Sequence, residues 1–172
     1  DRWRDAGEAL RVFEADLEND SGWAEAMEGC DAVAHVASPF PLTTPKHPDE
    51  LVKPARAGAL RALECAKKAG VTRFVLTSSA AAIAYGHEPG RDHFDESDWT
   101  VLENPDVPPY HRSKTVAEKA SREWVAQNAP DMAFCSINPV AVLGPVYDDD
   151  LSTSIELVRK LLTGEIPALP DA

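Results

Sequence analysis

Two hydrophobic patterns alternate along this chain. Short, mostly apolar runs, which are typical of strands buried on both faces of a parallel sheet, lie at residues 10–15, 31–37, 73–77 and 132–138. Apolar residues at the three- and four-residue spacing of amphipathic helices lie in segments 21–29, 49–69, 110–127 and 152–162. Strands that alternate with helices predict right-handed crossovers, and therefore an α/β fold with a doubly wound parallel sheet.

Polar or turn-forming residues follow directly after the predicted strands. Asp16, Ser38, Ser79 and Pro139 each lie just past a strand end. Ligands of doubly wound sheets bind beyond the carboxyl ends of the strands. We therefore expect these four residues to gather at one edge of the sheet, where a ligand would bind.

Tyr110 and Lys114 lie four residues apart at the start of the predicted helix 110–127, so they share one helix face. A neighbouring ammonium favours the phenolate, which makes the tyrosine a proton donor and acceptor usable near neutral pH. Ser79 could hold a substrate oxygen beside it. The spacing alone is a weak signal, because a tyrosine packed near a helix start with a solvated lysine produces it too.

Composition narrows the function classes. The chain has 172 residues, 44% of them hydrophobic, and a net charge of −12, which argues against binding to nucleic acid or an anionic membrane. No apolar run has the length of a membrane span. Cys30, Cys65 and Cys135 are odd in number and widely spaced, which predicts reduced, buried thiols in a cytoplasmic protein. The histidines lack metal-ligand spacing, so no metal site is predicted, and His35 is expected to be a packed strand residue.

Six segments together resemble one known family. They are Glu14-Ala15-Asp16-Leu17, Gly29 to Pro39, Leu76-Thr77-Ser78-Ser79-Ala80, Asp95-Glu96-Ser97-Asp98-Trp99, Tyr110 to Lys114 followed by Ala117-Glu118, and Asn138 to Pro145. In this order they resemble the extended short-chain dehydrogenase/reductases (the NAD-dependent epimerase/dehydratase family), and within it the dihydroflavonol-reductase-like branch that includes aldehyde and ketone reductases. The resemblance covers nearly the whole chain.

This resemblance implies an oxidoreductase that moves hydride between a nicotinamide cofactor and an aldehyde, a ketone or a secondary alcohol. Ser79, Tyr110 and Lys114 would be the catalytic residues. The residues that would contact the cofactor are Asp16 and Leu17 at the adenine, Val36, Ala37 and Ser38 at the central ribose and phosphates, Tyr110 and Lys114 at the reacting end, Pro139 and Val142 at the nicotinamide, and Ser154 at a phosphate. Asp16, Ser38 and Pro139 are also residues that ordinary turns favour.

The chain departs from the family pattern where the phosphates would bind. No glycines near the start have the spacing of the family's Gly-rich loop. We therefore expect residues 1–172 to be a partial NAD(P)-binding domain, an internal fragment of a longer protein. It would lack the first βαβ unit and the C-terminal substrate part, and it would be inactive by itself. The resemblance favours NADP, with NAD as the alternative. Arg2 and Arg4 are either ligands of its 2′-phosphate or surface charges.

Two positions argue against a flavonoid substrate. Ala84 stands where plant dihydroflavonol reductases have an asparagine, and His111 stands where they usually have an aromatic residue. A smaller aldehyde or ketone is favoured.

Two other functions stay open, and one acidic segment has two interpretations. A nucleotide-sugar epimerase or dehydratase would use the same Ser79, Tyr110 and Lys114, although the long loop before Tyr110 and the run 95–99 favour a reductase. A dinucleotide-binding regulator would need no chemistry, yet such proteins usually lose the tyrosine or the lysine. The acidic run 148–150 is a solvated loop or, less favoured, a metal site. The expected protein is a monomer or homodimer with a small-molecule substrate.

Overall fold

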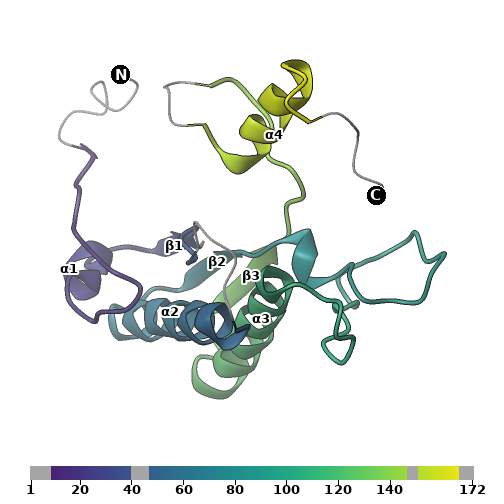
Figure 1. Ribbon diagram of the computed structural model, residues 1–172. Coiled ribbons are helices and arrows are strands. Elements are labelled where there is room, and N and C mark those ends of the chain that lie inside the picture. Colours follow the sequence, from purple (N-terminus) through teal and green to yellow (C-terminus); the bar gives the residue numbers. More distant parts are fainter. Residues whose placement is uncertain (1–8, 40–46, 147–150, 167–172) are drawn as a thin grey trace. The chain divides into compact units, whose positions relative to one another are not determined.

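The structure is a computed structural model that describes residues 9–39, 47–146 and 151–166 (Figure 1). Arg2, Arg4 and the acidic run 148–150 lie outside the described residues. The chain divides into two compact units, residues 1–138 and 139–172, which are described one at a time.

Three parallel strands form the sheet of the first unit. They are β1 (Ala32–His35), β2 (Arg73–Thr77) and β3 (Ala133–Ile137), in the spatial order β1-β2-β3. Val33 lies opposite Phe74, which in turn lies opposite Phe134. The parallel α/β architecture predicted from the alternating patterns is confirmed, and three of the four predicted strands are present within two residues of their expected bounds.

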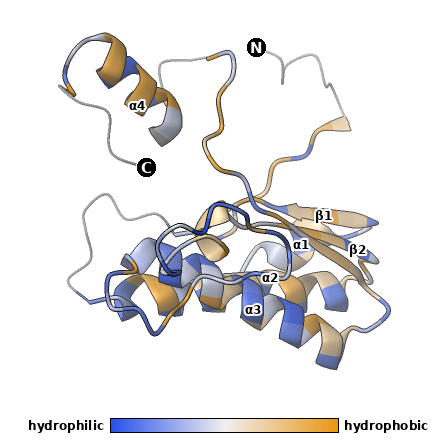
Figure 2. Cartoon of the chain, turned by 90° about the vertical axis from the view of Figure 1, so that its right-hand side faces the viewer, coloured by the Kyte–Doolittle hydropathy of each residue, from blue (hydrophilic) through white to orange (hydrophobic). Residues whose placement is uncertain are grey.

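Two long helices pack side by side against one face of this sheet, as both views show (Figures 1 and 2). They are α2 (Asp49–Lys68) and α3 (Pro109–Asn128), and the short helix α1 (Trp23–Met27) contacts α2. Acidic residues in the first turn of α2 and lysines in its last turn suit the helix dipole. No described helix of this unit covers the other face, where Ile137 is 54% exposed.

The core lies between the sheet and the helices. Leu63 of α2 and Phe74 of β2 are almost fully buried, and Phe74 stacks on Phe134 with ring centroids 6.1 Å apart. His35 is buried between Trp23 and Phe74, 6.1 and 6.0 Å from their ring centroids. The prediction that His35 is a packed strand residue is therefore confirmed.

The prediction that the three cysteines are buried is wrong. Cys135 is exposed and Cys30 and Cys65 are partly exposed. Cys135 lies on β3 between two partly buried residues, so its side chain points to the face of the sheet opposite to theirs.

The strand predicted at residues 10–15 is not formed. The segment is irregular, and Val12 is 87% exposed. A β-strand forms only when its backbone makes hydrogen bonds to a neighbouring strand. None of the described strands pairs with this segment. Hydrophobic pattern alone predicted a strand here, and the missing neighbour explains why the prediction was wrong.

The segment instead passes over the turn that begins α1. Gly22, the N-cap of α1, has φ +82°, and a Cβ built on it would lie 1.9 Å from the carbonyl oxygen of Glu14. Gly29, after the same helix, has φ +72° with no atom near such a Cβ. The first glycine is therefore required by conformation and by space, the second by conformation alone.

This difference makes a matched test. We expect Gly29→Ala to lower the free energy of unfolding by about 1–2 kcal/mol, the cost of a left-handed backbone for an L-residue, and Gly22→Ala to lower it clearly further because the Glu14 backbone must move. Urea unfolding of this chain, followed by tryptophan fluorescence, measures both. Equal losses would show that Glu14 does not restrict residue 22.

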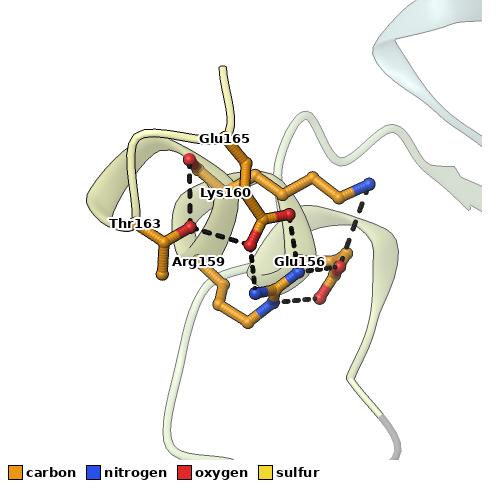
Figure 3. A network of polar contacts seen from close by, with 5 residues as sticks. All are labelled: Glu156, Arg159, Lys160, Thr163 and Glu165. Carbon is orange, nitrogen blue, oxygen red and sulfur yellow. Dashed lines mark hydrogen bonds and ion pairs between the residues drawn. The ribbon is translucent and has the colours of Figure 1, made fainter. Parts of the chain in front are cut away.

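The second unit contains α4 (Thr153–Leu162). The Ser152 side chain caps its N-terminus by accepting a hydrogen bond from the Ile155 N–H. At the other end the Arg159 guanidinium bridges the carboxylates of Glu156 and Glu165, with its shortest distance to each 2.7 Å (Figure 3). These exposed ion pairs hold the segment after α4 against the helix.

Candidate active site

A small hollow lies where β1 and β2 end, between the sheet and the two long helices. Leu17, Ala37, Ser38 and Lys114 are among the residues that line it. Its volume of about 20 Å³ has room for about one water molecule. It is therefore far too small to enclose a dinucleotide. Three residues expected to contact the cofactor and one expected to be catalytic thus meet around one hollow.

Tyr110 and Lys114 project from the first turns of α3. Pro109 starts this helix at a position where its missing N–H costs nothing. The Lys114 Nζ lies 5.6 Å from the centroid of the Tyr110 ring, so the predicted pairing of the two side chains is present. Lys114 is only 8% exposed, and no ion pair or hydrogen bond joins its side chain to another described residue. Burial lowers the pKa of its ammonium.

Ser79 lies just past β2, at the N-cap of the short 3₁₀ turn η2 (Ala80–Ala82), which packs against α3. Its Oγ accepts a hydrogen bond from the Ala81 N–H at 3.1 Å. Because a hydroxyl has one hydrogen to donate as well as lone pairs, this bond leaves the Ser79 O–H able to donate to a substrate oxygen. Ser78, by contrast, is buried, lines the hollow and has no hydrogen-bond partner for its Oγ among the described residues.

Asp16 and Leu17 form the turn before α1. The Asp16 carboxylate is exposed, and one of its oxygens accepts a hydrogen bond from the Glu18 N–H at 2.9 Å. Asp16 therefore stabilises a turn, which was one of the two roles that the sequence allowed. Leu17 packs on α2 at Gly58, where a Cβ would lie 3.0 Å from a Leu17 methyl carbon. Val36, which follows β1, is 67% exposed and does not line the hollow.

Pro139, Val142 and Ser154 belong to the second unit. There the Ser154 Oγ accepts a hydrogen bond from the Val142 N–H at 3.3 Å. The structure therefore brings together a residue expected at the nicotinamide and a residue expected at a cofactor phosphate. The Val142 side chain is 62% exposed.

His35 lines the hollow from the end of β1. Burial, and then the nearby charge of Lys114, lower its pKa to about 4. The imidazole is therefore neutral at physiological pH, and it presents a neutral wall beside the buried ammonium. Sequence reasoning identified it as packed but did not place it next to the predicted catalytic lysine.

A buried carboxylate was missed as a site residue. Glu118 is 2% exposed and accepts hydrogen bonds from Ser136 Oγ (2.6 Å), Asn138 Nδ2 (2.8 Å) and Arg122 Nε (3.0 Å). Burial alone would raise its pKa, but these hydrogen bonds together hold the pKa below its ordinary value. The Ser78 hydroxyl lies toward the same carboxylate without meeting hydrogen-bond geometry. The available signal was a glutamate on the inner face of a helix, one turn beyond Lys114.

The last part of the segment before α3, residues 100–107, is attached to two neighbouring elements. The Arg112 guanidinium donates to the carbonyl oxygens of Leu102, Asn104 and Val107. The buried Thr100 hydroxyl donates to the Ala81 carbonyl oxygen at 2.8 Å and so ties the segment to η2. The loop predicted at residues 86–109 is therefore fixed to the elements that carry Ser79 and Tyr110.

Comparison with known proteins identifies the lineage. The sequence profile of the NAD dependent epimerase/dehydratase family matches residues 2–171. The chain belongs to this family. A curated member, cinnamoyl-CoA reductase CAD2 of Medicago truncatula, is 36% identical over 92% of this chain and 50% of its own length. The chain spans about half the length of the curated relatives it matches.

Two solved structures of family members resemble this one. Vestitone reductase of alfalfa (Medicago sativa) has a TM-score of 0.74 and 33% identity, over 91% of this chain and 49% of its own. The yeast methylglyoxal/isovaleraldehyde reductase Gre2, complexed with NADPH, has a TM-score of 0.71 and 31% identity, over 86% of this chain and 49% of its own. Both likenesses extend the family assignment to the fold.

The described parts of the chain contain no group of three or more His, Cys, Asp or Glu side chains placed to hold a metal ion. None of the helices within these parts combines the length and the apolar character needed to cross a membrane.

Proposed function

We propose that the full-length gene product carrying this chain is an NADPH-dependent reductase of small aldehydes or ketones that also oxidises the corresponding secondary alcohols. One observation carries the proposal. Lys114 is buried without an ion pair among the described residues, beside the Tyr110 ring, in a hollow lined by Leu17, Ala37 and Ser38. The product would act as a cytoplasmic monomer or homodimer; the odd number and wide spacing of the cysteines support the compartment.

The side chains present suit a nicotinamide nucleotide. An ammonium has three donors and no acceptor, and the Lys114 ammonium has no acceptor among the described residues, which the hydroxyls of a ribose would supply. Leu17, Ala37 and Ser38 would lie against the cofactor at the floor of the site. Asp16, Val36, Pro139, Val142 and Ser154 are proposed as further cofactor contacts on the resemblance. NADPH, when bound, supplies the hydride.

The catalytic roles divide among three side chains. Ser79 donates a hydrogen bond to the carbonyl oxygen of the substrate, using the hydrogen that its contact with Ala81 leaves available. Tyr110 donates to the same oxygen and transfers its proton there. Lys114 favours the phenolate that results and orients the ribose. The protein thus supplies orientation and a proton at one atom, the carbonyl oxygen.

A small substrate is favoured by Ala84 and His111, which differ from the residues of the plant flavonoid reductases, and by the name of one relative. His111 lies edge-on to Tyr85, with ring centroids 4.0 Å apart, and burial lowers the pKa of its imidazole. It therefore presents a neutral ring beside the catalytic tyrosine. Methylglyoxal and isovaleraldehyde, the substrates in the name of the yeast relative, are the first compounds to test.

The assay follows the loss of NADPH absorbance with each aldehyde, using the full-length gene product, and is repeated with NADH. Because epimerisation and dehydration consume no NADPH, conversion of a UDP-sugar in the presence of NAD is measured separately, by chromatography of the nucleotide sugar. We expect NADPH oxidation with the aldehydes and no conversion of the nucleotide sugar. Conversion of the UDP-sugar without aldehyde reduction would assign the protein to the epimerases or dehydratases of the family.

A further inference from the structure

The main chain of Ser79 takes part in a series of hydrogen bonds that begins on α3. The Asn138 side-chain amide donates to the Ser79 carbonyl oxygen at 3.0 Å and to the Glu118 carboxylate at 2.8 Å. Both partners are acceptors only, so the amide must present its nitrogen to both. Through this amide, the main chain of the predicted catalytic serine is joined to the helix that carries the predicted catalytic tyrosine and lysine.

Glu118 lies on the same face of α3 as the predicted catalytic tyrosine and lysine. Tyr110, Lys114 and Glu118 are four residues apart in succession, so they follow one another along a single helix face. Glu118 therefore anchors Ser79 to the same face that presents Tyr110. Asn138 and Glu118 thus connect the elements that carry the Ser79 and Tyr110 hydroxyls, and neither hydroxyl takes part in this connection.

The carboxylate is itself held in place. Ser136 of β3 and Arg122, one turn further along α3, both bind its other oxygen. Since a buried carboxylate with several donors is charged and has little freedom to rotate, Glu118 is a rigid acceptor for the amide. Ser79 is further restrained by the Ala82 N–H, which donates to the same Ser79 carbonyl at 2.9 Å.

We propose that Asn138 and Glu118 are positioning residues for Ser79, and that they set its hydroxyl at the distance from Tyr110 that binding one carbonyl oxygen requires. The inference rests on the proposed function, because it assigns Ser79 a part in the reaction. Neither residue touches the substrate. A displacement of about 1 Å at a reacting group can lower a rate about a hundred-fold, so a positioning residue has a measurable effect.

The test is a double-mutant cycle in the full-length gene product with Ser79→Ala and Asn138→Ala. Alanine at position 79 keeps the carbonyl that Asn138 binds but lacks the hydroxyl. We expect Asn138→Ala alone to lower kcat about ten- to a hundred-fold with little change in the KM for NADPH. In the Ser79→Ala background the same change should alter kcat less than about two-fold.

Stability provides the second readout. Asn138→Ala should lower the free energy of unfolding of this chain equally in the wild-type and the Ser79→Ala backgrounds, because the amide loses the same carbonyl partner in both. Gly29→Ala is the matched control, because it is expected to destabilise the chain through its left-handed backbone and a Cβ at this position contacts none of Glu118, Asn138 and Ser79. It should lower stability while kcat stays within about two-fold of wild type.

Each outcome decides a separate question. Multiplicative losses in kcat, or an unchanged kcat in Asn138→Ala, would overturn the positioning role while leaving the reductase function intact. An unchanged kcat in Ser79→Ala would refute the catalytic role of Ser79, and the positioning role with it. If Asn138→Ala does not fold, Glu118→Gln replaces it in the same cycle, because an amide at position 118 cannot accept from Asn138, Ser136 and Arg122 together.

Discussion

Tyr110→Phe should lower the turnover of the full-length gene product about 10²–10⁴-fold, the usual contribution of a general acid, while NADPH affinity stays close to that of the wild type. The change removes one oxygen and keeps the ring that lies 5.6 Å from the Lys114 ammonium. Steady-state kinetics with an aldehyde and NADPH titration by fluorescence measure the two quantities.

Tyr85→Phe is the matched control, because it removes the same hydroxyl from a tyrosine that is 45% exposed. It should leave turnover close to wild type. Lys114→Met offers a contrast: it should weaken both turnover and NADPH binding, since the ammonium would serve the cofactor as well as the tyrosine. Full turnover in Tyr110→Phe would rule out the proposed proton donor.

His35 should make this chain less stable as the pH falls from about 6.5 to about 4. The folded protein keeps the imidazole neutral down to a pKa of about 4, whereas in the unfolded chain it takes up a proton near the ordinary value of 6.5. The stabilisation is therefore fully present above pH 6.5, is lost as the pH falls through this window, and changes no further below it. A difference of this size corresponds to up to about 3 kcal/mol.

His35→Leu should remove most of this dependence, because leucine fills a similar space and does not titrate. Urea unfolding at intervals from pH 7 to pH 5 measures the slope above the range where most carboxylates titrate. His93→Leu is the control, since the His93 side chain is 98% exposed. His111, whose pKa is also lowered by burial, retains a smaller slope of the same sign. An identical pH profile in His35→Leu and wild type would contradict the assignment.

Much of the fold could be read from periodicity because its elements are locally determined. The strand 73–77 was predicted with its observed bounds, and the helix 49–69 to within one residue. The failure at residues 10–15 has a different cause. An apolar pattern is a local property, whereas a strand forms only by pairing with a neighbour. None of the described strands pairs with residues 10–15, however apolar the segment is.

In the candidate site, too, contacts set by local spacing were predicted, and contacts set by tertiary packing were not. Tyr110 and Lys114 were recognised because four-residue spacing on a helix brings side chains together whatever the rest of the fold does. Glu118 and Asn138 were not recognised as partners, because they are 20 residues apart and meet only when α3 packs beside β3. The placement of His35 beside Lys114 likewise depends on how α3 lies against the end of β1.

Because Arg112 attaches the segment before α3 through backbone carbonyl groups, the attachment does not depend on the side chains of residues 87–98. The three carbonyl contacts lie at the end of that segment nearest α3, so exchanges of residues 87–98 between relatives leave them intact. Loop grafting in this stretch can therefore change its surface without redesigning α3, the helix that carries Tyr110.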